Sequence, residues 1–542
     1  MSYNIARTLA GVAARFPDRT GLIVPAGTGY RRWTFAELLA NSGRFANVLA
    51  AGGVKRGDRV MLMVKPSMEF VCLTFALFRM GAVVILIDPG MGYRNLLHCI
   101  GSVAPVVFIG IPRAHLFKAV FPHSFRTVRT SLWVGSLVPP LVPSLNRLAA
   151  KAATAHAMVE ADRDELAAVI FTTGSTGPPK GVQYTHGIFH AQLHYIRSYY
   201  QITAHDRDQP AFPLFALFST ALGACAVIPD MDPTRPAQVD PERFVRTIRD
   251  HDVTYSFGSP AIWNVVSRYC LEKKMTLGVK KILMAGAPVS GELVERVKKI
   301  MAPDGEVFTP YGATESLPIA SISGTEILAE TWPLTRKGRG TCVGRPLPGI
   351  EIRIMETAEG PVTELAAASF AAPGVIGEII VRGDVVTRSY DHNERENRLA
   401  KISDGDSFWH RLGDMGYFDG QDRLWFCGRK AHRVLTGGEI LYSVCCEAIF
   451  NEHPEVFRSA LVGVGHPGRQ VPVLIVEPRG PIADEQTFLS ELAQLARQNL
   501  LTQNISRFLI HTSFPVDIRH NAKIFREKLA LWAAGEIGES AG

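Results

Sequence analysis

Paired cysteines and long apolar runs are both scarce in this 542-residue sequence. The eight cysteines form no CxxC pair, and only Cys445 and Cys446 are adjacent. This spacing disfavours a disulfide framework or a zinc site, and it favours a reducing, cytoplasmic compartment. No stretch of about 20 uncharged apolar residues occurs, which excludes a transmembrane helix. The best candidate, 71–87, is interrupted by Arg79 and Gly81 and predicts a buried helix followed by a strand. Residues 1–16 carry arginines within an apolar pattern, so we expect an amphipathic first helix, not a signal peptide.

Acidic residues are absent from one long segment. Residues 89–159 contain no Asp or Glu but seven Lys or Arg residues, whereas the rest of the chain is neutral. Aromatic residues are scattered through the same segment. A peripheral contact with a membrane or with an acidic pathway enzyme would use such a region, although a solvated loop surface is the commoner origin of this pattern. Because the charge is local and no nucleic-acid-binding module occurs, nucleic acid is not an expected partner.

The most informative stretch is FTTGSTGPPKGV, residues 171–182. The apolar run 166–171 precedes it and predicts a buried strand. Glycines allow the backbone to approach a ligand closely, and hydroxyls and a lysine bind anionic oxygens. We therefore predict a phosphate-binding loop, although the spacing differs from that of a Walker A loop. The alternative is a surface turn rich in Gly, Ser, Thr and Pro. The predicted phosphate-binding residues are Thr172, Thr173, Gly174, Ser175, Thr176, Gly177 and Lys180.

Alternating strand and helix patterns continue on both sides of this loop and predict an α/β fold. Loops 172–181, 285–288 and 311–315 each follow a predicted strand, and ligands of open α/β sheets bind at that end. After about residue 341, short strands with Gly and Pro turns predict a small β-barrel-like subdomain. We expect a large N-terminal domain of stacked, mostly parallel sheets at 1–428, which includes this subdomain at 341–428. A hinge at 429–432 and a small, mobile α+β domain at 433–542 complete the prediction.

Five stretches in order together resemble the adenylate-forming superfamily of acyl-CoA synthetases, firefly-type luciferases and peptide-synthetase adenylation domains. The resemblance covers essentially the whole chain and implies ATP and Mg²⁺ as cofactors and an acyl-adenylate intermediate. The matching stretches are FTTGSTGPPKGV (171–182), YGATES (311–316), GDMGYF (413–418), GRKAHRVLTGGEI (428–440) and NAKIFREKL (521–529).

This resemblance also implies a role for individual residues. Glu315 with Thr314 would hold Mg²⁺, a hard cation suited to oxygen ligands. Tyr311 and Gly312 would contact adenine, with Gly286 and Ala287 on its other side. Asp414 would accept hydrogen bonds from the ribose, with Arg429 nearby. Lys523 would bridge the acyl carboxylate and the α-phosphate, so Lys523, Glu315 and Thr172 are the candidate catalytic residues.

Three departures from the superfamily pattern bear on the second half-reaction. Ala431 occupies the usual hinge position, Ala216 stands where many acyl-CoA ligases carry a gating histidine, and Asn521-Ala522 replaces the usual glycine before Lys523. With further stretches such as FPLFALFS (212–219), they look like the β-lactone synthetases of bacterial long-chain olefin biosynthesis. That branch activates a 2-alkyl-3-hydroxy acid, whose own hydroxyl closes the ring.

Other functions remain open from the sequence alone. A long-chain fatty acyl-CoA ligase would share the first half-reaction, and an adenylate-binding protein without turnover is a third possibility. An apolar pocket for a long chain is predicted, although a buried sheet face would carry the same residues. His186 lies near the phosphate loop, but a structural role is expected for it. The predicted pocket residues are Phe212, Phe215, Leu217, Phe218, Phe257, Gly258 and Trp263.

Overall fold

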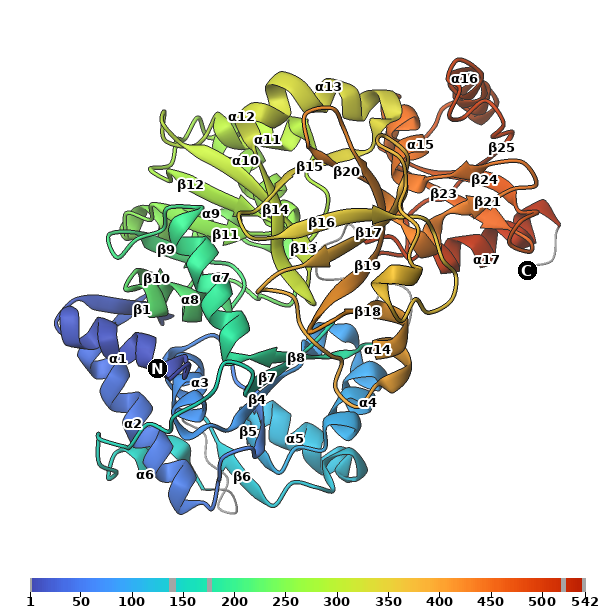
Figure 1. The fold of residues 1–542 in the computed structure, drawn as a ribbon. Helices are drawn as coiled ribbons and strands as arrows, with labels where there is room; N and C mark the ends of the chain where they lie inside the picture. The colour runs from blue at the N-terminus through green and yellow to red at the C-terminus, as the bar shows by residue number, and fades with distance from the viewer. Residues whose placement is uncertain (1, 136–142, 173–177, 518–522, 539–542) are drawn as a thin grey trace.

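Figure 1 shows the fold of the chain in a computed structural model, which describes residues 2–135, 143–172, 178–517 and 523–538. A large part contains two sheets with their helices, and a smaller C-terminal part, drawn in orange and red, lies at one side. The predicted mixed α/β architecture with a small C-terminal α+β part is thus the observed one.

The six-stranded sheet carries the predicted phosphate loop. Its strands are parallel except for the last pair, in which β8 runs antiparallel to β7. The predicted strand 166–171 is confirmed as β7, whereas the return strand β8 after the loop was not predicted. In order across the sheet, the strands are β6 (Thr130–Trp133), β5 (Val107–Gly110), β3 (Arg59–Met63), β4 (Val83–Leu86), β7 (Leu166–Phe171) and β8 (Gly181–Thr185).

The second sheet has 14 strands and continues without a break into the region predicted to be a β-barrel-like subdomain. Strand β15 pairs with β14 on one side and with β20 on the other, and this double pairing joins the two regions. In order, the strands are β16 (Glu351–Met355), β17 (Gly377–Arg382), β19 (Ser407–Phe418), β20 (Leu424–Arg429), β15 (Thr341–Pro346), β14 (Ser316–Ser323), β13 (Glu306–Ala313), β12 (Lys281–Met284), β11 (Tyr255–Gly258), β9 (Arg207–Pro210), β10 (Cys225–Val227), β1 (Thr20–Ala26) and β2 (Gly29–Thr34), with β18 (Lys401–Asp404) beside β19.

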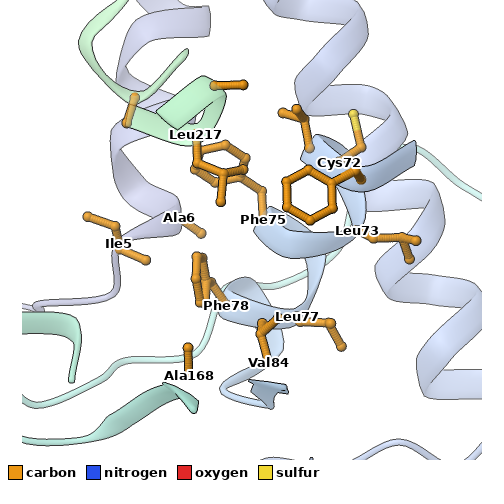
Figure 2. Packing of buried hydrophobic residues seen from close by; sticks show 14 of the residues in the cluster. Ile5, Ala6, Cys72, Leu73, Phe75, Leu77, Phe78, Val84, Ala168 and Leu217 are labelled. Atoms are coloured by element: carbon orange, nitrogen blue, oxygen red, sulfur yellow. The ribbon is translucent and has the colours of Figure 1, made fainter. Parts of the chain in front are cut away.

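Helix α3 (Met68–Met80) lies at the centre of the large part. Every residue from Phe70 to Met80 is buried, as expected for a helix that is apolar on all sides. Figure 2 shows Phe75 and Phe78 of this helix among side chains from distant segments, including Ile5, Leu217 and Ala168. This core joins helix α8 of the large sheet to strand β7, so it fixes the two sheets relative to each other. The predicted buried helix after residue 71 is confirmed.

The other helices of the large part cover the sheets. Helix α9 illustrates the local signals, because Asp240 accepts hydrogen bonds from the amides of Glu242 and Arg243 and Pro241 follows as the first helical residue. These helices are α1 (Ala6–Arg15), α2 (Phe35–Ala51), α4 (Tyr93–Val103), α5 (Pro112–Val120), α6 (Leu145–Ala149), α7 (His186–Ser198), α8 (Phe215–Leu222), α9 (Pro241–Asp250), α10 (Pro260–Glu272), α11 (Gly291–Lys298), α12 (Gly324–Glu326), α13 (Trp332–Leu334) and α14 (Glu394–Ala400).

The C-terminal part is built on a three-stranded sheet with an apolar cluster on each face. One cluster includes residues of α15 and α16, and the other includes residues of α17. A two-stranded hairpin, β21 (Val434–Leu435) and β22 (Ile440–Leu441), leads into it. The remaining elements are α15 (Ser443–Phe450), β23 (Val456–Val464), β24 (Val471–Pro478), α16 (Glu485–Arg497), β25 (Arg507–Ile510) and α17 (Arg526–Ile537). Within the described ranges, no helix has both the length and the apolar character needed to cross a membrane.

Candidate active site

One cavity of about 2050 Å³ runs between the two sheets and reaches the C-terminal part. Except for Leu217 and Trp263, all predicted site residues that the structure describes lie in its wall, although they come from segments up to 351 residues apart in sequence. These residues are Thr172, Lys180, Phe212, Phe215, Phe218, Phe257, Gly258, Gly286, Ala287, Tyr311, Gly312, Thr314, Glu315, Asp414, Arg429 and Lys523. The predicted loop residues Thr173, Gly174, Ser175, Thr176 and Gly177 lie outside the described residues.

The two ends of the phosphate loop are held together at the sheet. The Thr172 amide donates to the Lys180 carbonyl at 3.0 Å, which closes the β7–β8 hairpin at its base. The ammonium group of Lys180 contacts Glu396 of α14 and lies 5.1 Å from the ring centre of Tyr390. Lys180 is therefore a positioned cation at the base of the loop, able to meet an anionic ligand.

Glu315 lies at the turn between β13 and β14 and is fixed by its neighbours. The Tyr390 hydroxyl donates to Glu315 Oε1 at 2.8 Å, and the Thr387 amide donates to the Glu315 carbonyl at 2.8 Å. On the other side of the turn, the Tyr184 hydroxyl donates to the Thr314 carbonyl at 2.5 Å. Burial, and next the charge of the nearby Glu315 carboxylate, raise the pKa of Tyr390. The Tyr390 hydroxyl therefore stays protonated and remains a donor.

Glu315 and Thr314 satisfy the chemical requirement for a bound Mg²⁺. Both line the cavity, and together they offer a carboxylate and a hydroxyl oxygen, the hard donors that Mg²⁺ prefers. Because Mg²⁺ usually keeps several waters and substrate phosphate oxygens as ligands, two protein ligands on a cavity wall are enough. The residues present therefore fit the ion that the sequence implies.

Tyr311, Asp414 and Arg429 form a connected group, although β14 and β15 separate the strand of Tyr311, β13, from the paired strands β19 and β20. The Tyr311 hydroxyl donates to Asp414 Oδ2 at 2.6 Å, and Arg429 donates to Asp414 Oδ1 at 2.7 Å. Burial and the Asp414 charge raise the pKa of Tyr311, and the Asp414 charge raises the pKa of Arg429. Two donors thus hold the Asp414 carboxyl in a fixed orientation, which suits recognition of hydroxyl groups.

Two predicted glycines have conformations that favour glycine. Gly286 has a φ of 97°, and Gly312 has a φ of 156°. A Cβ atom on Gly312 would lie 2.2 Å from the backbone oxygen of Ser316 in the next strand. The tight β13–β14 hairpin that presents Glu315 therefore requires glycine at position 312.

The C-terminal part contributes Lys523 to the cavity wall. The Lys523 amide donates to Asp517 Oδ1 at 2.9 Å, and this bond fixes the backbone of the segment that carries the lysine. Nearby, Arg526 forms an ion pair with Glu447 of α15, and the distance from Arg526 Nη2 to Glu447 Oε2 is 2.7 Å. The start of α17 is thereby fixed to the rest of the C-terminal part.

The apolar end of the cavity differs from the prediction at two residues. The rings of Phe215 and Phe257 stack in the cavity wall with their centres 3.5 Å apart, as expected for a pocket that accepts an alkyl chain. Leu217 and Trp263 were also predicted to line it, but that prediction is wrong because neither is part of the cavity wall and both are buried in the core. They point away from the cavity since helix periodicity turns them towards the packed side of α8 and α10. Ala216, at the position where a gating histidine is common, is also fully buried.

His186 has a structural role, as predicted. Its Nδ1 accepts a hydrogen bond from the Ile5 amide at 3.2 Å, and burial lowers its pKa to about 4. The neutral ring therefore joins α7 to the N-terminal segment.

The sequence profile of AMP-binding enzymes matches residues 9–391. The chain belongs to the AMP-binding enzyme family. It is 42% identical to an olefin β-lactone synthetase from Stenotrophomonas maltophilia, over 99% of both chains. It is also 42% identical to an olefin β-lactone synthetase from Xanthomonas campestris, over 98% of this chain and 97% of the other.

A solved structure shows the same fold in an AMP-binding enzyme. The O-succinylbenzoate coenzyme A synthetase from Bacillus subtilis, in complex with ATP and magnesium ion, has a TM-score of 0.76 and 24% identity. The match covers 96% of this chain and 98% of that one.

Several residues around the cavity were not predicted from the sequence. Tyr184, Tyr390 and Glu396 contact predicted site residues, and Lys401 lies behind Tyr390 with its ammonium 6.0 Å from that ring. No local sequence pattern marks Tyr184, Tyr390 or Glu396, because their hydrogen bonds to predicted site residues span at least 75 positions of the chain. Two isolated pairings, Val386 with Ser316 and Tyr390 with Val182, bring this segment beside the site.

Proposed function

We propose that this protein is an ATP-dependent β-lactone synthetase that acts on a long-chain 2-alkyl-3-hydroxy acid. The acid is first activated as an acyl-adenylate, and its 3-hydroxyl group then closes a four-membered lactone. The observation that carries the proposal is the 42% identity to two olefin β-lactone synthetases over nearly the entire chain. A cavity that joins a charged end to an apolar end supports it.

In the first step, a carboxylate oxygen of the acid attacks the α-phosphorus of ATP. The new oxygen–phosphorus bond forms as the bond from the α-phosphorus to its bridging oxygen breaks, and pyrophosphate leaves. Lys180 and Lys523 neutralise the phosphate and carboxylate charges, and Asp414 orients the ribose. A Mg²⁺ held by Glu315 and Thr314 would supply further charge neutralisation on the phosphate oxygens. Phosphate oxygens would replace Glu396 as the partner of Lys180.

In the second step, the substrate supplies its own nucleophile. The 3-hydroxyl oxygen attacks the acyl carbon, the bond from that carbon to the AMP oxygen breaks, and AMP leaves while the hydroxyl proton is released. Holding both groups in one molecule supplies the proximity that a separate acceptor would otherwise provide. No external thiol is required, which agrees with Ala216 in place of a gating histidine. For the same reason, the domain rotation at 429–432 is not needed to admit an acceptor.

The apolar end of the cavity is suited to alkyl chains. Stacked Phe215 and Phe257 lie in its wall with Phe212 and Phe218, and these side chains would be covered by substrate carbon. A 2-alkyl-3-hydroxy acid has two chains on adjacent carbons, so it needs more apolar volume than a single fatty acyl chain of the same length.

Product analysis tests the proposal directly. The protein is incubated with ATP, Mg²⁺ and a 2-alkyl-3-hydroxy acid, with and without CoA, and the products are identified by mass spectrometry. We expect a β-lactone, AMP and pyrophosphate in equal amounts whether or not CoA is present. A CoA thioester without any lactone would instead make the protein an acyl-CoA ligase, and absence of any acid-dependent pyrophosphate would exclude both enzymes.

Substitution of Lys523 tests the adenylation step. In the Lys523→Ala variant we expect acid-dependent ATP–pyrophosphate exchange to fall at least about a hundredfold, because a charge that stabilises the transition state is lost. Lys528→Ala is the matched control, since Lys528 is an exposed lysine five residues later that contacts Phe525. Exchange that survives in Lys523→Ala would remove this lysine from the mechanism.

A cytoplasmic location and contact with pathway enzymes complete the proposal. All eight cysteines are free and buried, which agrees with a reducing compartment. Measuring the compartment of the tagged protein in its host would test the location.

A further inference from the structure

Part of the acid-free segment forms an exposed surface beside the six-stranded sheet. Helices α4 and α5 lie beside this sheet (Figure 1), and both contact the short helix Pro122–Phe125 that follows α5 in the chain. We call the exposed residues Tyr93, Arg94, Arg113, Leu116, Val120 and Arg126 the α4–α5 surface. Among the described residues, none from 89–159 forms an ion pair with a carboxylate. The basic groups on this surface are therefore available to an anionic partner.

Exposed apolar side chains are mixed with these arginines. Leu116 is 67% exposed, Val120 is 61% exposed and Tyr93 is 57% exposed, all high values for large apolar groups. On α5, Arg113, Leu116 and Val120 recur at helical spacing and therefore lie on one side. A helix that presents arginine beside aliphatic and aromatic groups matches the interface between lipid headgroups and acyl chains.

The same surface is connected to the active-site cavity. The ring of Tyr93 stacks on that of Phe121, with 6.3 Å between the ring centres. The ring centres of Phe121 and Phe117 are 4.9 Å apart. Phe117 lies in the cavity wall together with exposed Arg113 and, from the loop after β3, exposed Lys65. The cavity that contains Glu315 and Lys180 thus extends to the surface beside α5, and apolar residues line this end of it.

We propose that the α4–α5 surface docks on an anionic lipid surface and that the acyl substrate enters the cavity directly from the lipid beside Phe117. Arg94, Arg113 and Arg126 would contact lipid phosphates, while Tyr93, Leu116 and Val120 insert among the headgroups. The entry route rests on the proposed function, because only a long-chain substrate needs to leave a lipid phase. A lipid surface fits better than an acidic protein, since exposed apolar groups lie beside the end of the cavity that Phe117 lines.

Vesicle co-sedimentation tests the docking without substrate or ATP. The full-length protein is mixed with large unilamellar vesicles of phosphatidylcholine alone or of phosphatidylcholine with 30% phosphatidylglycerol. We expect binding only to the anionic vesicles, and loss of that binding at 0.5 M NaCl, because screening weakens exposed charges. Absence of binding to anionic vesicles, or equal binding to both kinds, would overturn the proposal.

Charge-reversal variants assign the binding to this surface. In Arg94→Glu/Arg126→Glu we expect partitioning onto anionic vesicles to fall at least about tenfold, since each basic residue near the membrane adds to the attraction. The control Arg246→Glu/Arg249→Glu changes the net charge equally on exposed positions of α9 and should bind within about twofold of the wild type. Equal losses in both variants would indicate a net-charge effect and would contradict docking through α4 and α5.

The apolar side of the surface has its own test. Leu116→Asn/Val120→Asn keeps the net charge, so weaker vesicle binding in this variant would report insertion and not attraction alone. Vesicle binding by a protein that forms no lactone would leave this proposal standing and reject the proposed function. Lactone formation by a protein that binds no vesicles would support the proposed function and reject the docking proposal. Capture of an acidic pathway enzyme in place of vesicles would assign the surface to that enzyme.

Discussion

At the scale of single residues, the orientation of Glu315 depends on one hydroxyl group. In Tyr390→Phe the hydrogen bond of 2.8 Å to Glu315 Oε1 is lost. We expect acid-dependent pyrophosphate exchange to fall about tenfold and the Mg²⁺ concentration for half-maximal exchange to rise, because bonds to charged groups contribute roughly 1.5–3 kcal/mol. Tyr195→Phe is the control, since its hydroxyl donates to Pro348 at 2.8 Å and does not line the cavity. Unchanged exchange in Tyr390→Phe would show that Glu315 needs no such support.

Lys401 gives a second prediction at this scale, on stability. Burial lowers its pKa from 10.5 to about 7. Between these values the unfolded chain binds a proton that the native protein lacks, so stability rises with pH across that window. Below about pH 7 the native state holds a charge that it solvates poorly. We expect Lys401→Met to be at least as stable as the wild type at pH 6, with a flatter dependence from pH 7 to 10 in urea unfolding. A less stable variant at pH 6 would show that the ammonium contacts outweigh its desolvation.

At the scale of elements, local patterns predict some strands well and fail for the hairpin partners. Strand β7 has the predicted bounds because it is an apolar run that ends beside a glycine-rich loop. Strand β8 was missed because the glycine- and proline-rich loop that precedes it obscures its start. Strand β14 was also missed, because residues 311–315 were predicted as a ligand-binding loop and not as the turn of a hairpin.

The β13–β14 hairpin makes a testable demand on glycine. In Gly312→Ala the added methyl group would lie 2.2 Å from the Ser316 oxygen, so the hairpin must move. We expect the free energy of unfolding to fall by about 2 kcal/mol or more, as for other forced overlaps. Gly278→Ala is the control, because its Cβ would have no atom within 4 Å. Similar urea midpoints for the two variants would contradict this account of the hairpin.

At the scale of the whole molecule, the predicted site residues could be gathered only through family motifs. Lys180 and Lys523 are 343 positions apart, and no composition or periodicity brings them to one cavity. Their order along the chain matched a known pattern, which is why the site was largely predicted. The contacts that hold the two parts together, such as Arg433 with Glu359 at 2.8 Å, have no such pattern and were missed.

Lys430, which precedes Ala431 in the predicted hinge, contacts the large part of the molecule. The Lys430 ammonium contacts the Ala358 carbonyl and lies 3.2 Å from Glu378 Oε2, and Glu378 is also paired with Arg411 at 2.6 Å. In Lys430→Met, Glu378 keeps its arginine partner, so the large part should stay folded while the link loosens. We expect amide hydrogens of 430–433 to exchange at least about tenfold faster, measured by mass spectrometry after deuteration.

Lys298→Met supplies the matched control for the link, because Lys298 pairs with Glu306 at a similar distance of 3.0 Å inside the large part. Its exchange rates at 430–433 should equal those of the wild type. If Lys430→Met also leaves those rates unchanged, the chain after Arg429 is held by Arg433 and the packed hairpin, and Lys430 contributes no anchor. Faster exchange in Lys430→Met alone would show that the anchoring function of the hinge lies one residue before Ala431.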